Sequence, residues 1–199
     1  MRIVLATANE DKVREMRHAL EGLGVEILTR EDFAGVPEVI EDGATIEDNA
    51  AKKARAVCEA TRLPAVADDT GLEVDALGGE PGVFSSRFAG EGATYADNVH
   101  KLLREMEGVP AGKRGARFRC VIALVEPSGA EIFVEGICEG TILDAPRGSG
   151  GFGYDPVFFV PSHGRTFAEL SLGEKDSISH RGRAMARMRR VLEERFQLK

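Results

Sequence analysis

Several features that mark particular classes of protein are missing from this sequence of 199 residues. Its three cysteines, Cys58, Cys120 and Cys138, are far apart and form no Cys-x-x-Cys pair. That spacing argues against both a disulfide framework and a zinc site. No uninterrupted apolar stretch approaches membrane-spanning length, so we expect no transmembrane helix and no membrane partner. The run Met1–Thr7 turns polar too soon for a signal peptide, and the sequence predicts a reduced, cytoplasmic protein.

An excess of positive charge is also missing. The chain has 26 Lys and Arg against 33 Asp and Glu, which gives a net charge of −7. Nucleic-acid binding needs a positive field over the phosphates, so we expect no nucleic-acid partner, although a local basic pocket can still hold a small anion. Hydrophobic residues at 43% and charged residues at 30% are typical of a globular protein and exclude disorder as the main state. The length fits one domain over residues 1–199.

The hydrophobic pattern predicts a mixed α/β chain. After a strand at 2–7, a helix with Val13, Met16, Ala19, Leu20 and Leu23 on one face leads to a second strand at 25–29. Thr45 and Thr94 begin two further helices as N-caps. The remaining expected elements are a strand at 65–67 that ends at residues 68–71, a possible extension at 72–77, a hairpin of 116–125 and 131–140 around Pro127-Ser128-Gly129, an apolar run at 157–160 and a helix from about 179 to 196.

A polar loop that contains a lysine follows the first predicted strand. It reads Thr7-Ala8-Asn9-Glu10-Asp11-Lys12 and leads into a predicted helix. Backbone N–H groups at a helix start attract phosphate, and Lys12 adds positive charge. The GxxxxGK[ST] pattern of a P-loop is absent. The loop is also compatible with a simple helix cap at Asn9, so both interpretations stay open.

Adjacent carboxylates follow the apolar strand at 65–67. Asp68-Asp69-Thr70-Gly71 stand where α/β sheets place ligands, and paired carboxylates can hold Mg²⁺ while one of them accepts a proton from water. A turn with Asp caps is the alternative. Aspartyl-phosphate phosphatases need carboxylates two residues apart, so that class is disfavoured. Glu41-Asp42-Gly43 offers further carboxylates for a metal, or forms an ordinary turn.

Two later stretches are suited to a nucleobase. In the glycine-rich loop 148–156, Phe152 and Tyr154 offer flat faces for stacking, and Asp155 can accept hydrogen bonds from base N–H groups. The alternative for this loop is a corner with two core aromatics. Lys175 is expected in a polar loop, and His180-Arg181 at the start of the last helix could bind carbonyl oxygens of a base. A structural histidine is the alternative there, and we interpret the remaining arginines of that helix as a solvated face or an oligomer contact.

Together these motifs resemble the inosine triphosphate pyrophosphatase family, also described as dITP/XTP or non-canonical purine nucleoside triphosphate pyrophosphatases. The stretches that carry the resemblance are TANEDK at 7–12, EDGAT at 41–45, DNAAKKA at 48–54, ADDTGL at 67–72, GEPGV at 79–83, GGFGYDP at 150–156 and ISHR at 178–181. They occur in the family's order along the whole chain. Thr70 stands where serine is more usual, and Asp48 where glutamate is common. Because threonine keeps the hydroxyl group, function is not in doubt.

The resemblance implies an ITPase-like, anticodon-binding-like α/β fold. Its elongated mixed central sheet is flanked by helices, and its two lobes have a nucleotide cleft between them. It also implies a homodimer, Mg²⁺ as cofactor, and hydrolysis of ITP, dITP or XTP to the monophosphate and pyrophosphate, which cleanses the nucleotide pool.

Family roles fall on matching positions. Asp69 would bind Mg²⁺ and accept a proton from the attacking water, with Glu41 as the second metal ligand. The implied substrate contacts are Thr7, Ala8, Asn9, Glu10, Asp11, Lys12 and Lys53 for the triphosphate, Thr70 beside it, Phe152, Gly153, Tyr154 and Asp155 around the base, and Lys175, His180 and Arg181 at the base edge.

Two other functions compete with this one. The septum-inhibition type of nucleotide pyrophosphatase prefers modified or pyrimidine nucleotides, but the Phe-Gly-Tyr-Asp and Ser-His-Arg motifs favour the purine branch. A non-catalytic nucleotide or RNA sensor could use the Arg-rich last helix. The acidic net charge and the carboxylates Glu41 and Asp69 argue against that sensor.

Overall fold

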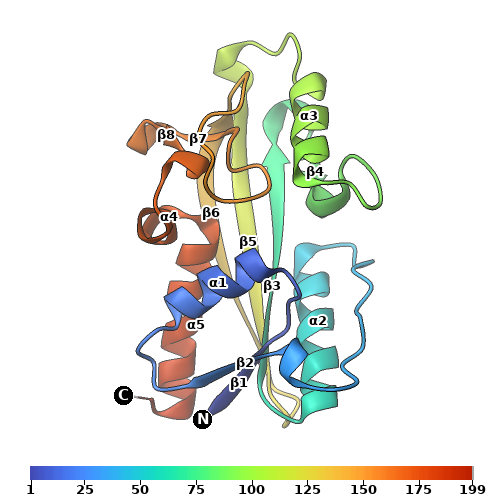
Figure 1. Ribbon diagram of the computed structural model, residues 1–199, viewed down its shortest axis with the longest axis vertical. Coiled ribbons are helices and arrows are strands. Elements are labelled where there is room, and N and C mark those ends of the chain that lie inside the picture. The colour runs from blue at the N-terminus through green and yellow to red at the C-terminus, as the bar shows by residue number, and fades with distance from the viewer. Residues whose placement is uncertain (199) are drawn as a thin grey trace. The chain divides into compact units, whose positions relative to one another are not determined.

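The computed structural model describes residues 1–198 and shows a central mixed sheet flanked by helices, so the predicted mixed α/β fold is confirmed (Figure 1). The helices are α1 (Glu10–Ala19), α2 (Ile46–Thr61), α3 (Tyr95–Glu105), α4 (Leu172–Ile178) and α5 (His180–Phe196). The strands are β1 (Arg2–Leu5), β2 (Glu26–Thr29), β3 (Ala65–Val74), β4 (Pro81–Gly82), β5 (Gly115–Val125), β6 (Glu131–Ile142), β7 (Phe158–Val160) and β8 (Arg165–Thr166).

The sheet has the strand order β2-β1-β3-β5-β6-β7-β8, and β4 pairs with β3. β1 is parallel to both β2 and β3, with Val4 opposite Leu28 on one side and Ala65 on the other. The pairs β3–β4, β6–β7 and β7–β8 are antiparallel. The order strand–helix–strand at the N-terminal end therefore gives the parallel part of the sheet.

The chain forms two compact units. The first contains Met1–Asp69, Cys120–Gly136 and the chain from Arg181 onward, and the second contains Thr70–Arg119 and Ile137–His180. Each unit has its own hydrophobic core. A single functional domain over residues 1–199 stays a prediction.

One side of the first unit is an apolar core between helices and strands. Met16 of α1, Leu20 directly after that helix and Met188 of α5 are fully buried and belong to the same cluster as Leu5 and Val66. The predicted apolar face of α1 is confirmed, because its other members are buried in this cluster or packed against it. Burial here follows the helical spacing of three and four residues.

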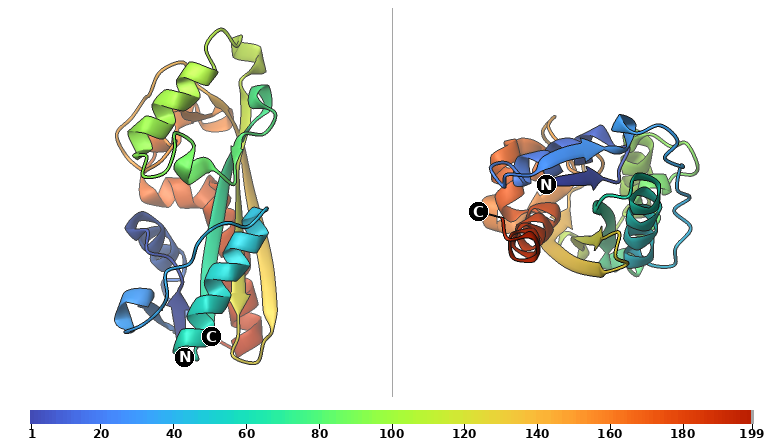
Figure 2. Two further views of the ribbon diagram at one scale, coloured as in Figure 1. Left: turned by 90° about the vertical axis from the view of Figure 1, so that its right-hand side faces the viewer. Right: turned by 90° about the horizontal axis from the view of Figure 1, so that it is seen from below.

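The opposite faces of the same strands are lined by small side chains. Ala65 and Ala67 alternate with Val66 along β3 and are also fully buried. The buried side of α2 carries Ala50 and Ala54. Figure 2, in its right-hand view, shows α2 and α5 on opposite sides of these strands. Small residues let a helix approach a sheet closely, and this brings the lysine of α2 within reach of β3.

The second unit has an aromatic core. Phe118, Phe158 and Phe167 form a cluster with ring centroids 4.7, 4.9 and 5.9 Å apart. α3 packs on this core through Leu102, which is fully buried. The predicted N-cap at the start of α3 is confirmed, because Thr94 and Asp97 exchange side-chain-to-backbone hydrogen bonds. The expected N-cap of α2 is also present, since the Thr45 hydroxyl accepts from the Asp48 N–H.

Two expectations about local structure are wrong. The strand at 65–67 does not end at Asp68, because β3 runs without a break to Val74. Charged neighbours compensate the negative charges of the two aspartates inside the strand. Strand propensity depends on the local sequence and does not include such neighbours. Lys175 lies in helix α4 and not in a loop. That helix begins with a capping box of Ser171 and Glu174, a signal of the same kind as the ones found at other helices.

The hairpin prediction is confirmed by β5 and β6. The turn between them is closed by hydrogen bonds from the Gly129 N–H to the Glu126 carbonyl and from the Glu126 N–H to the Ala130 carbonyl. Gly129 has a φ of 87°, which favours glycine. Within residues 1–198, no helix has both the length and the apolar character needed to cross a membrane.

Candidate functional site

Strand pairing in the first unit brings two of the predicted motifs to one edge of the sheet. Leu5, the last residue of β1, is opposite Val66 of β3, and the two strands are parallel. The loop that follows β1 and the carboxylates that follow Val66 therefore lie at the same edge of the sheet. Ligands bind at this edge of parallel sheets.

The adjacent aspartates of β3 point to opposite faces of the strand. Successive side chains of a strand alternate in direction, so Asp68 shares the face of Val66 and Asp69 does not. Asp68 is 3.2 Å from the ammonium group of Lys12 in α1. Asp69 instead accepts a hydrogen bond of 3.0 Å from Lys53 of α2. One strand thus provides a carboxylate to a lysine on each side.

Lys53 is held between two carboxylates. Its ammonium group donates to Asp69 Oδ1 at 3.0 Å and to Glu41 Oε2 at 3.1 Å. Burial acts to lower the pKa of Lys53, but Asp69 and Glu41 outweigh it and raise that pKa. Burial, together with the charge of Glu41, raises the pKa of Asp69. Burial acts in the same direction on Glu41, but Lys53 and Lys12 outweigh it and lower the pKa of Glu41.

A buried asparagine positions the Glu41 segment. The Gly43 N–H donates to Asn49 Oδ1 at 2.8 Å, and Asn49 is 1% exposed in the first half of α2. A Cβ atom on Gly43 would lie 2.6 Å from Asn49 Oδ1, so only glycine allows this approach. Glu41 reaches Lys53 because its segment is attached to the helix that carries this lysine.

The donor set of Glu41 and Asp69 fits Mg²⁺. Both side chains supply hard carboxylate oxygens, and both converge on the same ammonium group. Among residues 1–198, no group of three or more His, Cys, Asp or Glu side chains is arranged to enclose a metal ion. Mg²⁺ is commonly held by one or two carboxylates together with substrate phosphates, so two carboxylates are sufficient for such a site.

The loop after β1 is organised by a helix cap. Asn9 Oδ1 accepts from the backbone N–H groups of Asp11 at 3.0 Å and Lys12 at 3.2 Å, and the Thr7 hydroxyl accepts from the Asn9 N–H. The cap at Asn9 that the sequence left as an alternative is therefore present. Ala8 and Glu10 are exposed. The cap occupies two of the backbone N–H donors of this loop. The positively charged Lys12 side chain is therefore the group of this loop that attracts an anion most strongly.

Arg181 lies among buried carboxylates of the first unit. Its Nε and one terminal nitrogen donate to Asp68 Oδ2 at 3.1 and 2.8 Å, and the other terminal nitrogen donates to Glu15 at 2.6 Å. Burial acts to raise the pKa of Asp68, but Lys12 and Arg181 outweigh it and hold that pKa far below the usual range. The carboxylate is therefore ionised at every physiological pH.

The second unit brings together three of the residues predicted to bind a base. Lys175 of α4 forms a buried ion pair of 2.5 Å with Asp155, and its ammonium group lies 4.7 Å from the centre of the Phe152 ring. The second Asp155 contact is to the backbone of the same loop, because its carboxylate accepts from the Phe152 N–H at 2.9 Å. The ring of Tyr95, an exposed aromatic residue of α3, is 5.9 Å from Phe152. An aromatic face beside a cation is thus held in place by Asp155.

Other residues predicted near the base have side chains in the core. The Tyr154 hydroxyl donates to the Ser85 carbonyl at 2.8 Å, and burial raises the pKa of Tyr154. The imidazole of His180 is stacked on Phe118 at a centroid distance of 4.5 Å. Gly153 and Thr70 are partly exposed.

The comparison with known protein families covers the whole stretch of chain in which these motifs occur. The profile of the Ham1 family matches residues 3–191. This chain belongs to the Ham1 family. A protein of Geobacter sulfurreducens named dITP/XTP pyrophosphatase is 54% identical over 185 residues, which cover 93% of each chain. One of Thermus thermophilus with the same name is 52% identical, over 93% of this chain and 88% of that protein.

Solved structures of Ham1 proteins have the same fold. The Coxiella burnetii HAM1 protein is 46% identical and superposes with a TM-score of 0.89, covering 98% of this chain and 99% of the other. The Staphylococcus aureus Ham1 protein is 36% identical with a TM-score of 0.87, covering 98% and 100%. Both likenesses extend over almost the whole chain.

Sequence reasoning missed three residues that this Ham1 chain places in the clusters. Asp68 was recognised only as a neighbour of Asp69, and Glu15 and Tyr95 were not considered. A signal exists for Glu15, since it lies three residues after Lys12 and so shares a helix face with it. No comparable signal links Tyr95 to Phe152, which is far away in the sequence.

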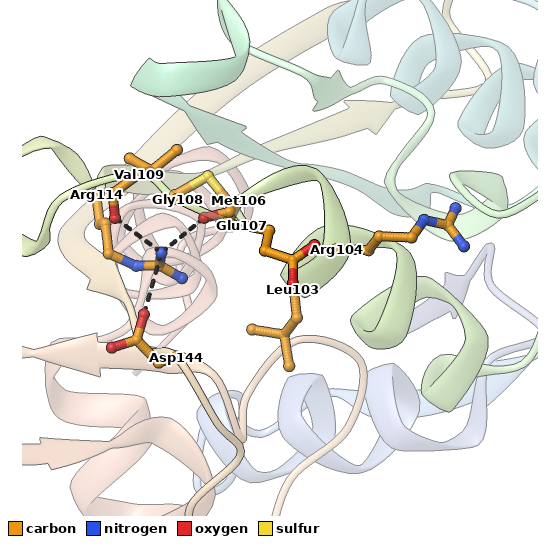
Figure 3. Close-up of a pocket in the computed structure, with 8 residues that line it drawn as sticks. All are labelled: Leu103, Arg104, Met106, Glu107, Gly108, Val109, Arg114 and Asp144. Atoms are coloured by element: carbon orange, nitrogen blue, oxygen red, sulfur yellow. Dashed lines mark hydrogen bonds and ion pairs between the residues drawn. The ribbon is translucent and has the colours of Figure 1, made fainter.

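The second unit also contains a hollow of about 600 Å³ at the C-terminal end of α3 (Figure 3). Its buried cation is Arg114, which donates to the Met106 and Val109 carbonyls and pairs with Asp144. These contacts join the end of α3 to the end of β6. None of the predicted site residues lines this hollow.

Proposed function

We propose that this chain is a Mg²⁺-dependent nucleoside triphosphate pyrophosphohydrolase that converts ITP, dITP and XTP to the monophosphate and pyrophosphate. The observation that carries the proposal is Lys53 held between Glu41 and Asp69, in a chain about half identical to proteins named dITP/XTP pyrophosphatase. This cluster combines a cation for phosphate, oxygens for a metal and a carboxylate that can accept a proton.

The triphosphate is bound by the cations of the first unit. Phosphoryl transfer depends on positioning and neutralisation of charge more than on covalent chemistry by the protein. Lys12 at the start of α1 and Lys53 in α2 both pair with carboxylates of β3. The backbone of residues 7–12 contributes the positive end of α1.

Asp69 accepts the proton of the attacking water. Its raised pKa makes it a better base than an ordinary aspartate, while the adjacent Lys53 keeps a population of the ionised form. Glu41 and Asp69 are the residues that would hold Mg²⁺. When bound, Mg²⁺ supplies neutralisation of the charge on the phosphate oxygens.

The base is bound by the second unit. Phe152 provides the stacking face, and Lys175, held by Asp155, donates to an oxo group of the purine. Gly153, Tyr154 and Thr70 contribute to the shape of the site, and His180 and Arg181, at the start of α5, meet the edge of the base. ATP is rejected because its 6-amino group would leave these donors unpaired.

The first experiment measures pyrophosphate release from ITP, XTP, ATP, GTP and a pyrimidine triphosphate, with Mg²⁺ and with a chelator. Rapid, Mg²⁺-dependent release from ITP and XTP alone is expected. A preference for the pyrimidine substrate would favour the septum-inhibition type. Tight binding without any turnover would favour a non-catalytic nucleotide-binding module.

A substitution tests the role of the carboxylate. Asp69→Asn is expected to abolish turnover without loss of the fold, because it removes the proton acceptor. The matched control is Glu73→Gln, since Glu73 lies on the same strand and pairs with Arg117 outside this cluster. Full activity of Asp69→Asn, in a preparation verified by mass spectrometry, would rule out the assigned role.

A second substitution tests the phosphate role of Lys12. Lys12→Ala is expected to weaken triphosphate binding much more than monophosphate binding, since only the longer chain of phosphates needs the additional charge. Calorimetric titration with ITP and with IMP, each under chelator, measures both affinities. Equal losses for the two ligands would contradict the assignment.

Two finer properties belong to the same proposal. We expect a homodimer, as the family resemblance implies, and light scattering coupled to size-exclusion chromatography measures this directly. We also expect the protein to act in the cytoplasm, where thiols stay reduced. The three buried cysteines, each a free thiol, are compatible with that compartment.

A further inference from the structure

The direction of the Phe152 ring is not set by its neighbours in the loop. Gly150, Gly151 and Gly153 have no side chains that could pack against the ring. The Phe152 N–H donates to Asp155 Oδ2 at 2.9 Å, which fixes the backbone and leaves the side-chain torsions free. The rotamer of Phe152 therefore depends on side chains that other elements bring to it.

Side chains from α4 and α3 lie against this ring. The ammonium group of Lys175 is 4.7 Å from the ring centre, and Lys175 is itself held by Asp155. The ring centre of Tyr95 is 5.9 Å from that of Phe152, and the two ring planes are tilted by 41°. Aromatic rings at this distance and tilt are in direct contact, so no base fits between them. Tyr95 therefore supports Phe152 and does not form the opposite wall of a base sandwich.

Tyr95 stands at the well-fixed start of α3. The Thr94 hydroxyl accepts from the Asp97 N–H at 3.2 Å, and the Asp97 carboxylate accepts from the Thr94 N–H at 2.9 Å. Further along the same helix, Leu102 is fully buried in the core of the second unit. The Tyr95 side chain is 43% exposed, so it is not needed to fill that core. Its ring is thus an exposed aromatic group on an anchored helix, in contact with the loop residue Phe152.

We propose that Tyr95 is a positioning residue for the base, because it holds the Phe152 ring in the orientation in which a purine stacks on it. Tyr95, Phe152, Asp155 and Lys175 all belong to the second unit, so this support lies within one compact part of the chain. Without Tyr95, the Phe152 ring would have to be ordered each time a base binds, and the cost of that ordering weakens binding. The inference rests on the proposed function and specifies how its base site is kept ready.

The test compares a ligand that has a base with one that has none. Calorimetry under chelator measures the affinities of ITP and of inorganic tripolyphosphate for the wild type and for Tyr95→Ala. We expect ITP binding to weaken about fivefold, which lies within the range that one aromatic pair allows, and tripolyphosphate binding to stay unchanged. The matched control is His100→Ala, an exposed residue of the same helix. Unchanged ITP affinity in Tyr95→Ala, or an equal loss for both ligands, would overturn the proposal.

A conservative variant separates the ring from the hydroxyl group. Tyr95→Phe keeps the ring and is expected to bind ITP nearly as well as the wild type. A loss in Tyr95→Phe as large as that in Tyr95→Ala would show that the hydroxyl group acts instead of the ring contact. In steady-state assays, Tyr95→Ala should raise KM for ITP and leave kcat unchanged, since it affects binding of the base equally before and during the reaction. A lowered kcat with an unchanged KM would contradict a positioning role.

A double variant tests whether Tyr95 acts through Phe152. If it does, Tyr95→Ala costs almost no further ITP affinity once Phe152→Ala is present, so the two losses are not additive. Additive losses would show that Tyr95 acts on the base by itself and would refute this inference.

Pyrophosphate release from ITP by the wild type tests the proposed function separately. If the wild type releases pyrophosphate while Tyr95→Ala binds ITP normally, this inference alone is wrong. If the wild type binds ITP but does not hydrolyse it, the proposed reaction is wrong, and the comparison of ITP with tripolyphosphate still decides the role of Tyr95.

Discussion

The buried ion pair between Lys175 and Asp155 is expected to stabilise the second unit strongly. Both side chains are 4% exposed, and they are 2.5 Å apart. Lys175→Met removes the cation and leaves the Asp155 charge in a buried place, where the Phe152 N–H is a remaining donor. Loss of one partner of a buried pair costs about 3–5 kcal/mol, so we expect the free energy of unfolding to fall by that amount.

Tyrosine fluorescence during urea unfolding provides a local assay. The chain has no tryptophan, and its two tyrosines, Tyr95 and Tyr154, both belong to the second unit. The signal therefore reports the unit in which the pair lies. The fitted slope with urea has to match that of the wild type for the free energies to be compared.

A double variant separates the lost pair from the lost side chain. Lys175→Met combined with Asp155→Asn removes both charges and keeps an oxygen that accepts from the Phe152 N–H. We expect the double variant to be more stable than Lys175→Met by about 2 kcal/mol, because no unpaired charge is left buried. If Lys175→Met alone is within about 1 kcal/mol of the wild type, the pair is not desolvated and this reasoning is refuted.

Three further predictions concern single residues. Gly151→Ala should reduce ITP affinity, measured as KM, since Gly151 has a φ of 67° and an added Cβ would meet Asp155 Oδ2 at 2.0 Å; an unchanged KM would contradict this. Leu102→Ala should lower the free energy of unfolding by about 2–5 kcal/mol, because the side chain is fully buried. A loss below about 1 kcal/mol would show that neighbouring side chains fill the cavity that the substitution leaves. A hydrogen bond from Arg165 lowers the pKa of Glu174 from 4.5 to about 2. The stabilisation from Glu174 is therefore complete above about pH 4.5 and lost as pH falls through about 2, and Glu174→Gln should flatten this part of the pH profile of Tm.

Local signals in the sequence predicted much of the fold. Thr45 and Thr94 cap helices as expected, and the turn at Gly129 closes the expected hairpin. These features depend on residues only a few positions apart, so the spacing of side chains is sufficient to recognise them. The capping box of Ser171 and Glu174 is a signal of the same kind, and it begins a helix at the place where the sequence analysis expects a loop around Lys175.

The continuity of β3 could not be read from its sequence. Two adjacent aspartates and a glycine are typical of a turn, and by local preference the strand ends there. In the folded chain, Lys12 and Lys53 pair with the aspartates from opposite faces, so the strand continues through them. The compensation comes from residues outside the strand, which a local pattern does not contain.

The sequence by itself determined the family, the order of the motifs and the chemical types of the residues, because these depend only on which residues occur and in what order. It identified Asp69 and Lys53 as candidates for the site. Only the tertiary structure decided which charges are neighbours. It places Arg181 against Asp68, 113 positions away, and directs its side chain to the cluster that contains Lys12. Residues so distant in the chain meet only when β3, α1 and α5 pack together, because the pairing of a buried charge is a property of that packing and not of any one segment.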